Sequence, residues 1–193
     1  MTTQIPDFFM YEDNLYEVVG INGKGLILPQ DFGVSSTGFS TACLRGHCLE
    51  YAILEENLNL ASLSLLLSKN DEHKKINDTL PVGDTDHFFD PSFGRFLMYK
   101  YPKLNIPIPY SGGILIVKDF VREFGVAEFP QSYETVFELL FDNGKLTKVI
   151  DWSGLIAKER SETLANRPNK PNFVVEFSLK YDFFYFNHMN QYV

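Results

Sequence analysis

The fold is decided by the stretch Phe141-Asp142-Asn143-Gly144-Lys145-Leu146. Asparagine and glycine both tolerate the positive φ angles of a two-residue hairpin turn, so Asn143-Gly144 predicts a tight β-hairpin. The residues before this turn alternate between apolar and polar from Tyr133 to Phe141, which is typical of a strand with one buried face. Leu146 to Trp152 is then the expected return strand.

Two other stretches resemble this hairpin, Tyr11-Glu12-Asp13-Asn14-Leu15 and Leu54-Glu55-Glu56-Asn57-Leu58. An internal repeat and three independent hairpins both explain the likeness, and both predict the same antiparallel topology. Asn22-Gly23-Lys24-Gly25 predicts a fourth turn, between strands over Tyr16–Ile21 and Leu26–Leu28.

The remaining elements follow from periodicity. Phe173 to Phe186 alternates strictly for most of its length and predicts a long strand. Lys118 to Phe124 and Leu155 to Ala165 have helical spacing, the second with Ser153 as a candidate N-cap. We therefore expect an α+β fold, predominantly antiparallel sheet arranged as a meander or half-barrel, with one or two short helices.

The length of 193 residues fits a single globular domain over residues 1–193. The stretch from Ser68 to Tyr110 has no sustained period and contains several prolines. Irregular stretches of this length often serve as binding loops, so we expect an insertion or lid at about 68–110.

Composition and charge argue against several classes of partner. The formal net charge is −8, and Lys74-Lys75 form the only basic cluster, among acidic residues. This disfavours nucleic acid, which selects clustered Lys and Arg, and anionic membranes. We expect a cytoplasmic protein, because no signal peptide or membrane span is apparent and the two cysteines, Cys43 and Cys48, are too few for a disulfide framework.

The most suggestive polar pattern is Cys43-Leu44-Arg45-Gly46-His47-Cys48. Read as a strand, it places Arg45 and His47 on one face, about 6.5–7 Å apart along the strand. An arginine beside a histidine can bind an anion, and its charge would lower the pKa of the histidine. The alternative is a structural role, with Arg45 paired to a carboxylate and His47 hydrogen-bonded in the core or at its rim.

Tyr110-Ser111-Gly112-Gly113 offers a second candidate anion site. Paired glycines can expose backbone N–H groups to an anion, although the lysine and hydroxyl of a phosphate loop are missing. The alternative is a turn that leads into a buried strand over Ile114–Val117.

The sequence indicates no catalytic residue, cofactor or metal. On a strand, His47 points away from Cys48 and lies too far from Cys43 to act as its base. Asp84-Thr85-Asp86-His87-Phe88-Phe89-Asp90 fails the EF-hand pattern, which needs glycine at the sixth position and glutamate at the twelfth. A looser divalent site on Asp84, Asp86, His87 and Asp90 is an alternative to a solvated acidic loop.

Several short motifs together resemble a family of uncharacterised bacterial proteins. They are Thr41-Ala42-Cys43-Leu44-Arg45-Gly46, Pro109-Tyr110-Ser111-Gly112-Gly113-Ile114-Leu115 and the hairpin from Tyr133 to Leu146. The family has a T-A-C-W-R-G-Y run, where this chain has Leu44 and His47. The resemblance implies a bacterial origin and favours Arg45 over His47 as the fixed feature, but it implies no activity.

Three functional hypotheses remain. The first is a non-enzymatic, immunity-like or adaptor-like protein whose acidic face binds a basic protein partner; the face would carry Glu12, Asp13, Glu55, Glu56, Glu134, Glu138 and Asp142. The second is a small-molecule binder or enzyme with an anion site at Arg45, which requires Arg45 to line a cavity with no carboxylate in salt-bridge range. The third is a homodimer in which Phe- and Tyr-rich strands pair.

Overall fold

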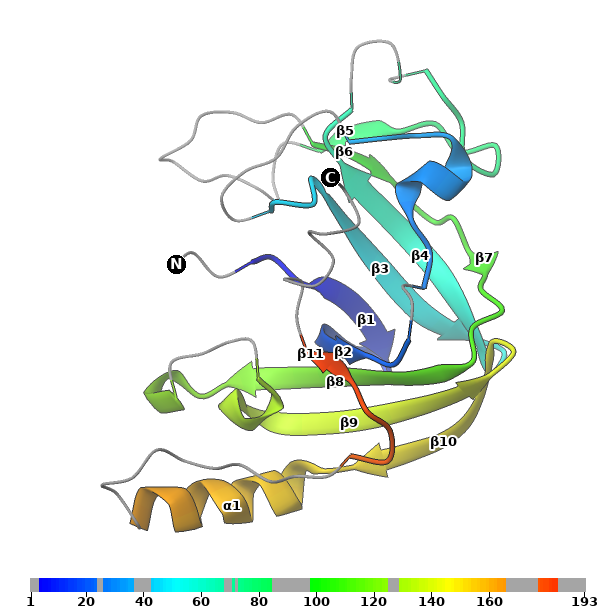
Figure 1. Cartoon of the computed structure of the whole chain (residues 1–193). Coiled ribbons are helices and arrows are strands. Elements are labelled where there is room, and N and C mark those ends of the chain that lie inside the picture. Colours follow the sequence, from blue (N-terminus) through cyan, green and yellow to red (C-terminus); the bar gives the residue numbers. More distant parts are fainter. Residues whose placement is uncertain are drawn as a thin grey trace.

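A computed structural model of the chain describes residues 4–23, 26–36, 43–67, 71, 73–84, 98–124, 129–165 and 177–183. Over these residues the protein is mostly sheet with one α-helix (Figure 1). The strands are β1 (Asp7–Tyr11), β2 (Asn14–Ile21), β3 (His47–Leu54), β4 (Asn57–Leu65), β5 (Val82–Asp84), β6 (Met98–Tyr101), β7 (Ile106–Pro107), β8 (Gly112–Phe120), β9 (Tyr133–Asp142), β10 (Lys145–Asp151) and β11 (Asp182–Phe183). The helices are α1 (Ser153–Ala165) and the short 3₁₀ turns η1 (Pro29–Phe32), η2 (Arg122–Phe124) and η3 (Pro130–Ser132).

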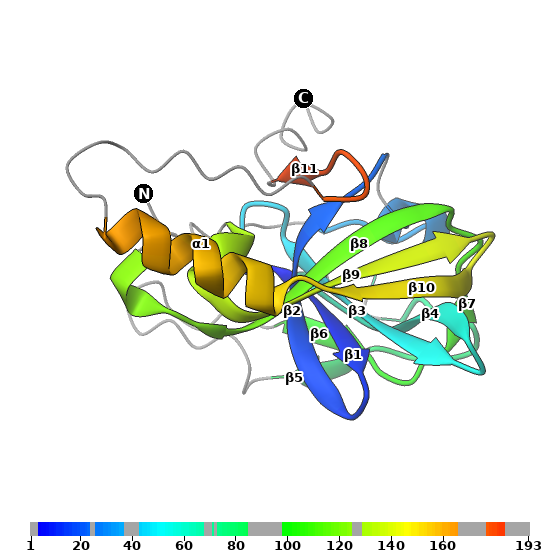
Figure 2. The same cartoon turned by 90° about the horizontal axis from the view of Figure 1, so that it is seen from below.

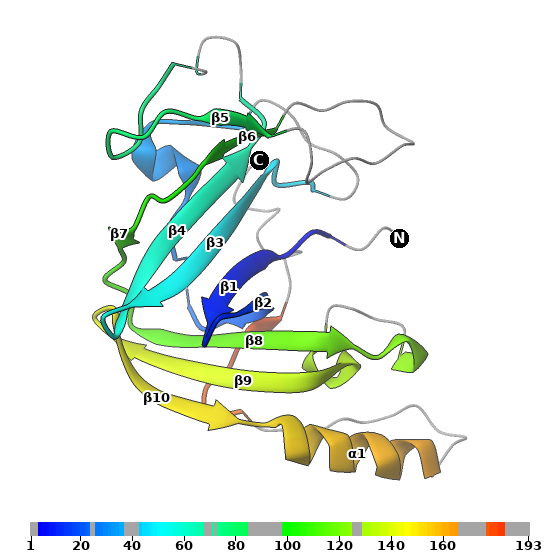
Figure 3. The ribbon, with the colours of Figure 1, turned by 180° about the vertical axis from the view of Figure 1, so that it is seen from behind.

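All of these strands belong to one mixed sheet, with the order β10-β9-β8-β2-β1-β3-β4-β6-β5. The β1–β3 pair is parallel, and the other pairs are antiparallel. Strand β10 also pairs with β4, through Lys145 and Asn57. The sheet therefore bends until its first and seventh strands meet at one end, and Figures 1 and 3 show the β3–β4 and β9–β10 turns side by side there.

The three predicted hairpins are confirmed. β1–β2 turns at Glu12-Asp13, β3–β4 at Glu55-Glu56 and β9–β10 at Asn143-Gly144. Both turn residues have positive φ in every case. The first two turns share a further detail, because the asparagine that follows each acidic pair donates a hydrogen bond of 2.8 Å to the carbonyl of the first turn residue.

The third turn needs its glycine for a separate reason. Gly144 has a φ of 83°, and a Cβ there would lie 2.5 Å from the carbonyl oxygen of Ile108. Its N–H donates to the carbonyl of Tyr110, and its own carbonyl accepts from Leu58 N–H at 2.7 Å. Gly144 thus lets the β9–β10 turn lie directly against neighbouring backbone and closes the sheet.

The main core fills the space enclosed by the bent sheet. Its largest fully buried members come from the five strands β1, β3, β4, β6 and β8 and include Phe9, Tyr51, Leu58, Leu60, Leu63, Leu65, Tyr101 and Ile114. Every second residue of a strand points to the same face, which places Leu58 with Leu60 and Leu63 with Leu65. A bulge in β4 opposite Glu50 and Tyr51 then brings both pairs to the same face.

A second core covers the opposite face of β8 and β9. Helix α1 contributes the fully buried Ile156, and the segment 177–183 contributes Phe177, Leu179 and Tyr181. Figure 2 shows β8, β9 and β10 fanned out with α1 continuing from the end of β10. The sequence predicts water on this face of β9, and that prediction is wrong because α1 and residues 177–183 lie over it.

Other expectations from the sequence are corrected by the structure. Lys118–Phe120 ends strand β8, so the helix expected over 118–124 is limited to the single turn η2. Residues 26–28 lead into η1 and form no return strand. Of the expected strand 173–186, only Asp182–Phe183 within 177–183 is extended and paired, and the rest lies outside the described residues.

The expected helix from Leu155 is confirmed as α1. The stretch expected to be an insertion or lid, 68–110, adds β5, β6 and β7 to the sheet beside β4 in its described part. Residues 85–97 lie outside the described part of the chain.

Candidate functional site

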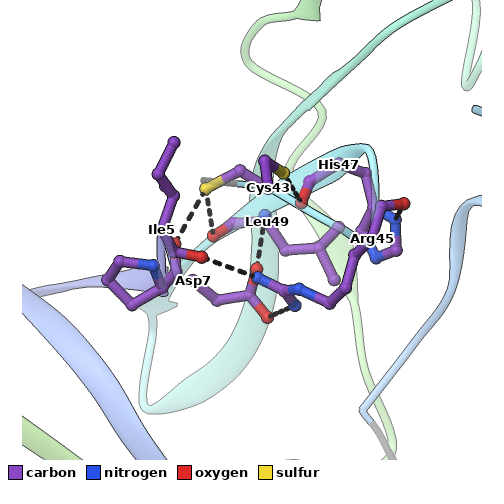
Figure 4. Close-up of polar contacts among 8 residues, drawn as sticks. Ile5, Asp7, Cys43, Arg45, His47 and Leu49 are labelled. Atoms are coloured by element: carbon purple, nitrogen blue, oxygen red, sulfur yellow. Dashed lines mark hydrogen bonds and ion pairs between the residues drawn. The ribbon is translucent and has the colours of Figure 1, made fainter. Parts of the chain in front are cut away.

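Arg45 is held by a carboxylate (Figure 4). Its Nη1 lies 2.9 Å from Asp7 Oδ2, and its Nη2 donates to the carbonyl of Ile5 at 3.2 Å. The other carboxylate oxygen of Asp7 accepts from the N–H of Leu49 at 2.8 Å. The exposed fractions of the two charged side chains are 11% for Arg45 and 4% for Asp7. The requirement that no carboxylate lie in salt-bridge range of Arg45 is therefore not met.

Arg45 and His47 do not project together from one strand. Residues 44–46 form a turn closed by a hydrogen bond of 3.1 Å from Gly46 N–H to the carbonyl of Cys43, and β3 begins only at His47. His47 is 2% exposed, and its Nδ1 lies 3.0 Å from the carbonyl oxygen of Arg45. The strand expected to span this motif is thus wrong, since the turn occupies its first half.

Beside the Arg45–Asp7 pair lie three buried ionisable groups, His47, Cys43 and Cys48, whose burial favours their neutral forms. Burial lowers the pKa of His47, and the charge of Arg45 lowers it further. Burial also raises the pKa of the Cys43 thiol and, more strongly, that of Cys48. Each thiol donates to a backbone carbonyl, Cys43 to His47 and Cys48 to Pro6. These features describe a clamp that fastens the start of β1 to the start of β3.

Tyr110, Ser111, Gly112 and Gly113 also occupy structural positions. The Tyr110 hydroxyl lies 2.7 Å from the carbonyl oxygen of Asn22 and 3.0 Å from that of Gly113, and burial raises its pKa to about 12. A Cβ on Gly112 would lie 2.7 Å from the Tyr110 hydroxyl, and a Cβ on Gly113 would overlap the hydroxyl of Tyr181. The two glycines thus make room for two tyrosine hydroxyls.

Tyr181 reaches past Gly113 to a buried carboxylate. Glu138 has an exposed fraction of 0% and accepts hydrogen bonds from Tyr181 Oη at 2.8 Å, Trp152 Nε1 at 2.9 Å and Ser178 N–H at 3.4 Å. Burial and the bond to Glu138 raise the pKa of Tyr181. The expectation that Glu138 belongs to an exposed acidic face is wrong for this reason.

The other members of the expected acidic face lie at two kinds of place, beside helix α1 and at the hairpin turns. Glu134 pairs with Arg160 of α1 at 2.9 Å. Glu12-Asp13 and Glu55-Glu56 leave the sheet at the same end, because β1 and β3 run parallel. Asp142 lies at the β9–β10 turn, and Ser111 contacts this turn. The Oγ of Ser111 accepts a hydrogen bond from Asn143 N–H at 2.7 Å and lies 3.4 Å from Asp142 Oδ1.

A groove that the sequence does not reveal lies within the described residues. It has a volume of about 180 Å³ and runs across β2, β1, β3, β4 and β6 on the face turned away from the main core, and Figure 3 shows β1, β3 and β4 side by side. Its lining comprises Phe8, Leu15, Cys48, Leu49, Glu50, Ser62, Ser64 and Lys100. Finding it from the sequence would require the strand pairings, which place Phe8 beside Glu50 and Ser64 beside Lys100.

The described residues show neither a cluster of metal-binding side chains nor a membrane-spanning helix. Within the ranges given above, no three His, Cys, Asp or Glu side chains lie close enough together to hold a metal ion. The looser divalent site on Asp84, Asp86, His87 and Asp90 depends on side chains outside the described part of the chain. No helix in that part is long and apolar enough to span a membrane.

The fold and these clusters define an α+β protein with a bent mixed sheet and structural clamps at the motifs that sequence reasoning singled out. No family model, curated protein or solved structure gives a significant match to the chain.

Proposed function

We propose that this chain is a non-enzymatic protein-binding domain that docks a basic partner through its acidic hairpin turns. The observation that carries the proposal is the left-handed backbone conformation of the acidic residues in these turns. Glu12, Asp13, Glu55 and Glu56 have φ angles between 47° and 64°, a left-handed conformation that suits asparagine and glycine far better. The chain uses Asn143-Gly144 at the same two positions of its third hairpin, whereas the first two hairpins carry acidic pairs there.

Strain of this kind persists where the side chain has another use. Glu55 and Glu56 are exposed, and the neighbouring β9–β10 turn adds the exposed Asp142. Two backbone hydrogen bonds, Leu58 N–H to Gly144 and Leu146 N–H to Glu56, hold the two turns together. The three carboxylates of Glu55, Glu56 and Asp142 and the ammonium of Lys145 give this tip a net charge of −2.

The half-exposed Leu54 at this tip supplies an apolar contact beside the charges. Charge complementarity of this type raises association rates and selects against acidic partners. The Glu56–Lys145 pair is itself exposed and contributes little to stability, so its carboxylate can exchange Lys145 for a cation of the partner.

Three further proposals accompany this one, on the sheet, the cellular setting and the family. We interpret the bent sheet, joined at one end by β4 and β10, as a half-barrel. We propose a reducing, cytoplasmic setting, which agrees with two free buried cysteines. We also keep the likeness of the Thr41–Gly46 and Pro109–Leu115 motifs to an uncharacterised bacterial family as a prediction.

The test compares E55N/E56G with the wild-type chain in quantitative affinity capture from bacterial extract at two salt concentrations. The control E123Q/E159Q removes two carboxylates outside the hairpin turns, so both variants change the net charge equally. We expect basic proteins to be captured by wild type and control, to be lost on E55N/E56G, and to be released as ionic strength rises. Equal capture by all three proteins contradicts the docking role.

A further inference from the structure

The groove across β2, β1, β3, β4 and β6 is divided into an apolar and a charged half. Phe8 of β1 and Leu15 of β2 form one side, and Leu15 is 47% exposed. Glu50 of β3 and Lys100 of β6 form the other side. Ser62 and Ser64 of β4 lie between β3 and β6, and Cys48 lies two residues before Glu50 on β3. The small size of these three side chains leaves the hollow open.

The charged half is built by the sheet. Lys100 Nζ lies 3.3 Å from Glu50 Oε2, and Ser62 Oγ donates to the same oxygen at 2.9 Å. Both charged side chains keep access to solvent, with exposed fractions of 31% for Lys100 and 28% for Glu50. The ammonium group has three donors and the carboxylate has about four acceptor positions, so each retains capacity for a ligand.

We infer that this groove binds a small zwitterion with an apolar side group, of the class of free aliphatic α-amino acids. An anion without a positive charge would be repelled by the carboxylate of Glu50, and a cation without a negative charge would be repelled by the ammonium of Lys100. Neither can therefore bind favourably to both side chains. A zwitterion satisfies both, because its carboxylate faces Lys100 and its ammonium faces Glu50. The two charged groups of an α-amino acid are one carbon apart, which matches partner atoms separated by 3.3 Å.

The size and the apolar half define the rest of the ligand. A volume of about 180 Å³ is below the ~300–1,000 Å³ of pockets for drug-sized molecules. An aliphatic side chain placed on Phe8 and Leu15 would remove exposed apolar surface from water. The inference does not rest on the docking proposal, because it uses none of the acidic turn residues.

The experiment is a titration of the ¹⁵N-labelled full chain with L-leucine, followed by amide chemical shifts. Two analogues separate the charges: 4-methylpentanoate lacks the ammonium group, and 3-methylbutylamine lacks the carboxylate. We expect saturable shifts at the groove residues with a Kd on the order of 1 mM, and binding of each analogue weaker by about tenfold or more. Absence of saturable shifts at the groove, or equal binding of the three ligands, overturns the inference.

Variants assign the two charges to residues. Glu50→Gln and Lys100→Met should each weaken leucine binding about tenfold, whereas Glu123→Gln and Lys148→Met, outside the groove lining, should leave it unchanged. Leucine binding that survives both groove variants contradicts the inference. If a groove variant does not fold, the analogue series on the wild-type chain decides the question alone.

Discussion

Asp7 and Arg45 show how a functional-looking residue can be structural. The sequence pattern singles out Arg45 as a candidate anion-binding residue, yet its guanidinium donates hydrogen bonds to the Asp7 carboxylate and to the Ile5 carbonyl. Asp7 in turn accepts from the backbone of β3 at Leu49. Because Asp7 lies 38 residues before Arg45, nothing local in the sequence identifies it as the partner.

We expect Asp7→Ala to lower the free energy of unfolding by about 3–5 kcal/mol, because it leaves the mostly buried Arg45 cation without its carboxylate. Urea unfolding followed by far-UV circular dichroism measures this change. The double variant Asp7→Leu/Arg45→Met removes both charges, so its free energy of unfolding should fall clearly less than that of Asp7→Ala. An equal loss in the two proteins would contradict a burial penalty on an unpaired charge.

At the scale of elements, the hairpins were predictable and the coverings of the sheet were not. Each turn is encoded in four or five consecutive residues, so period-2 strands around Asn143-Gly144 or Glu55-Glu56 suffice to place it. The burial of Glu138 depends on Trp152, Ser178 and Tyr181, which approach from α1's start and from residues 177–183. Sequence alternation cannot report contacts made by such distant segments.

The Gly112-Gly113 pair illustrates the same limit. From the sequence, this pair predicts either an anion site or a turn that leads into a buried strand. In the structure the atoms next to the two glycines are the hydroxyls of Tyr110 and Tyr181, which the sequence gives no means of anticipating.

Gly113→Ala should therefore destabilise the packing of residues 177–183 on β8. The added Cβ overlaps the Tyr181 hydroxyl and lies 2.8 Å from its Cζ, so we expect a loss of about 1–3 kcal/mol in the free energy of unfolding. Gly154→Ala is the matched control, because nothing lies within 4 Å of its Cβ and the site is in a helix. That control should gain up to about 1 kcal/mol. Equal effects of the two substitutions would exclude the steric explanation.

For the molecule as a whole, stability should depend on pH through His47. Its pKa in the fold is lowered by burial and by Arg45, whereas in the unfolded chain it is near 6.5. Between these two values the unfolded state binds more protons than the native state. The contribution of His47 is thus fully present above pH ~6.5 and is lost as the pH falls toward its lowered native pKa, with a slope of at most about 1.4 kcal/mol per pH unit.

The measurement compares urea unfolding of wild type and His47→Gln at pH 7.5 and pH 5.5. The wild-type chain should lose more stability on acidification than the variant, and the difference between the two losses isolates His47 from the other titrating groups. A parallel loss in both proteins would show that His47 takes up its proton as easily in the fold as in the unfolded chain.

We propose that the chain keeps carboxylates in left-handed turns for docking and is less stable as a result. The most direct measurement is the free energy of unfolding of E55N/E56G against wild type. Asparagine and glycine suit φ angles of 50° and 64°, and the exposed Glu56–Lys145 pair that is lost contributes little. We predict that the variant is more stable by about 1 kcal/mol. A variant that is less stable than wild type would show that Glu55 and Glu56 serve the fold itself and would contradict the claim.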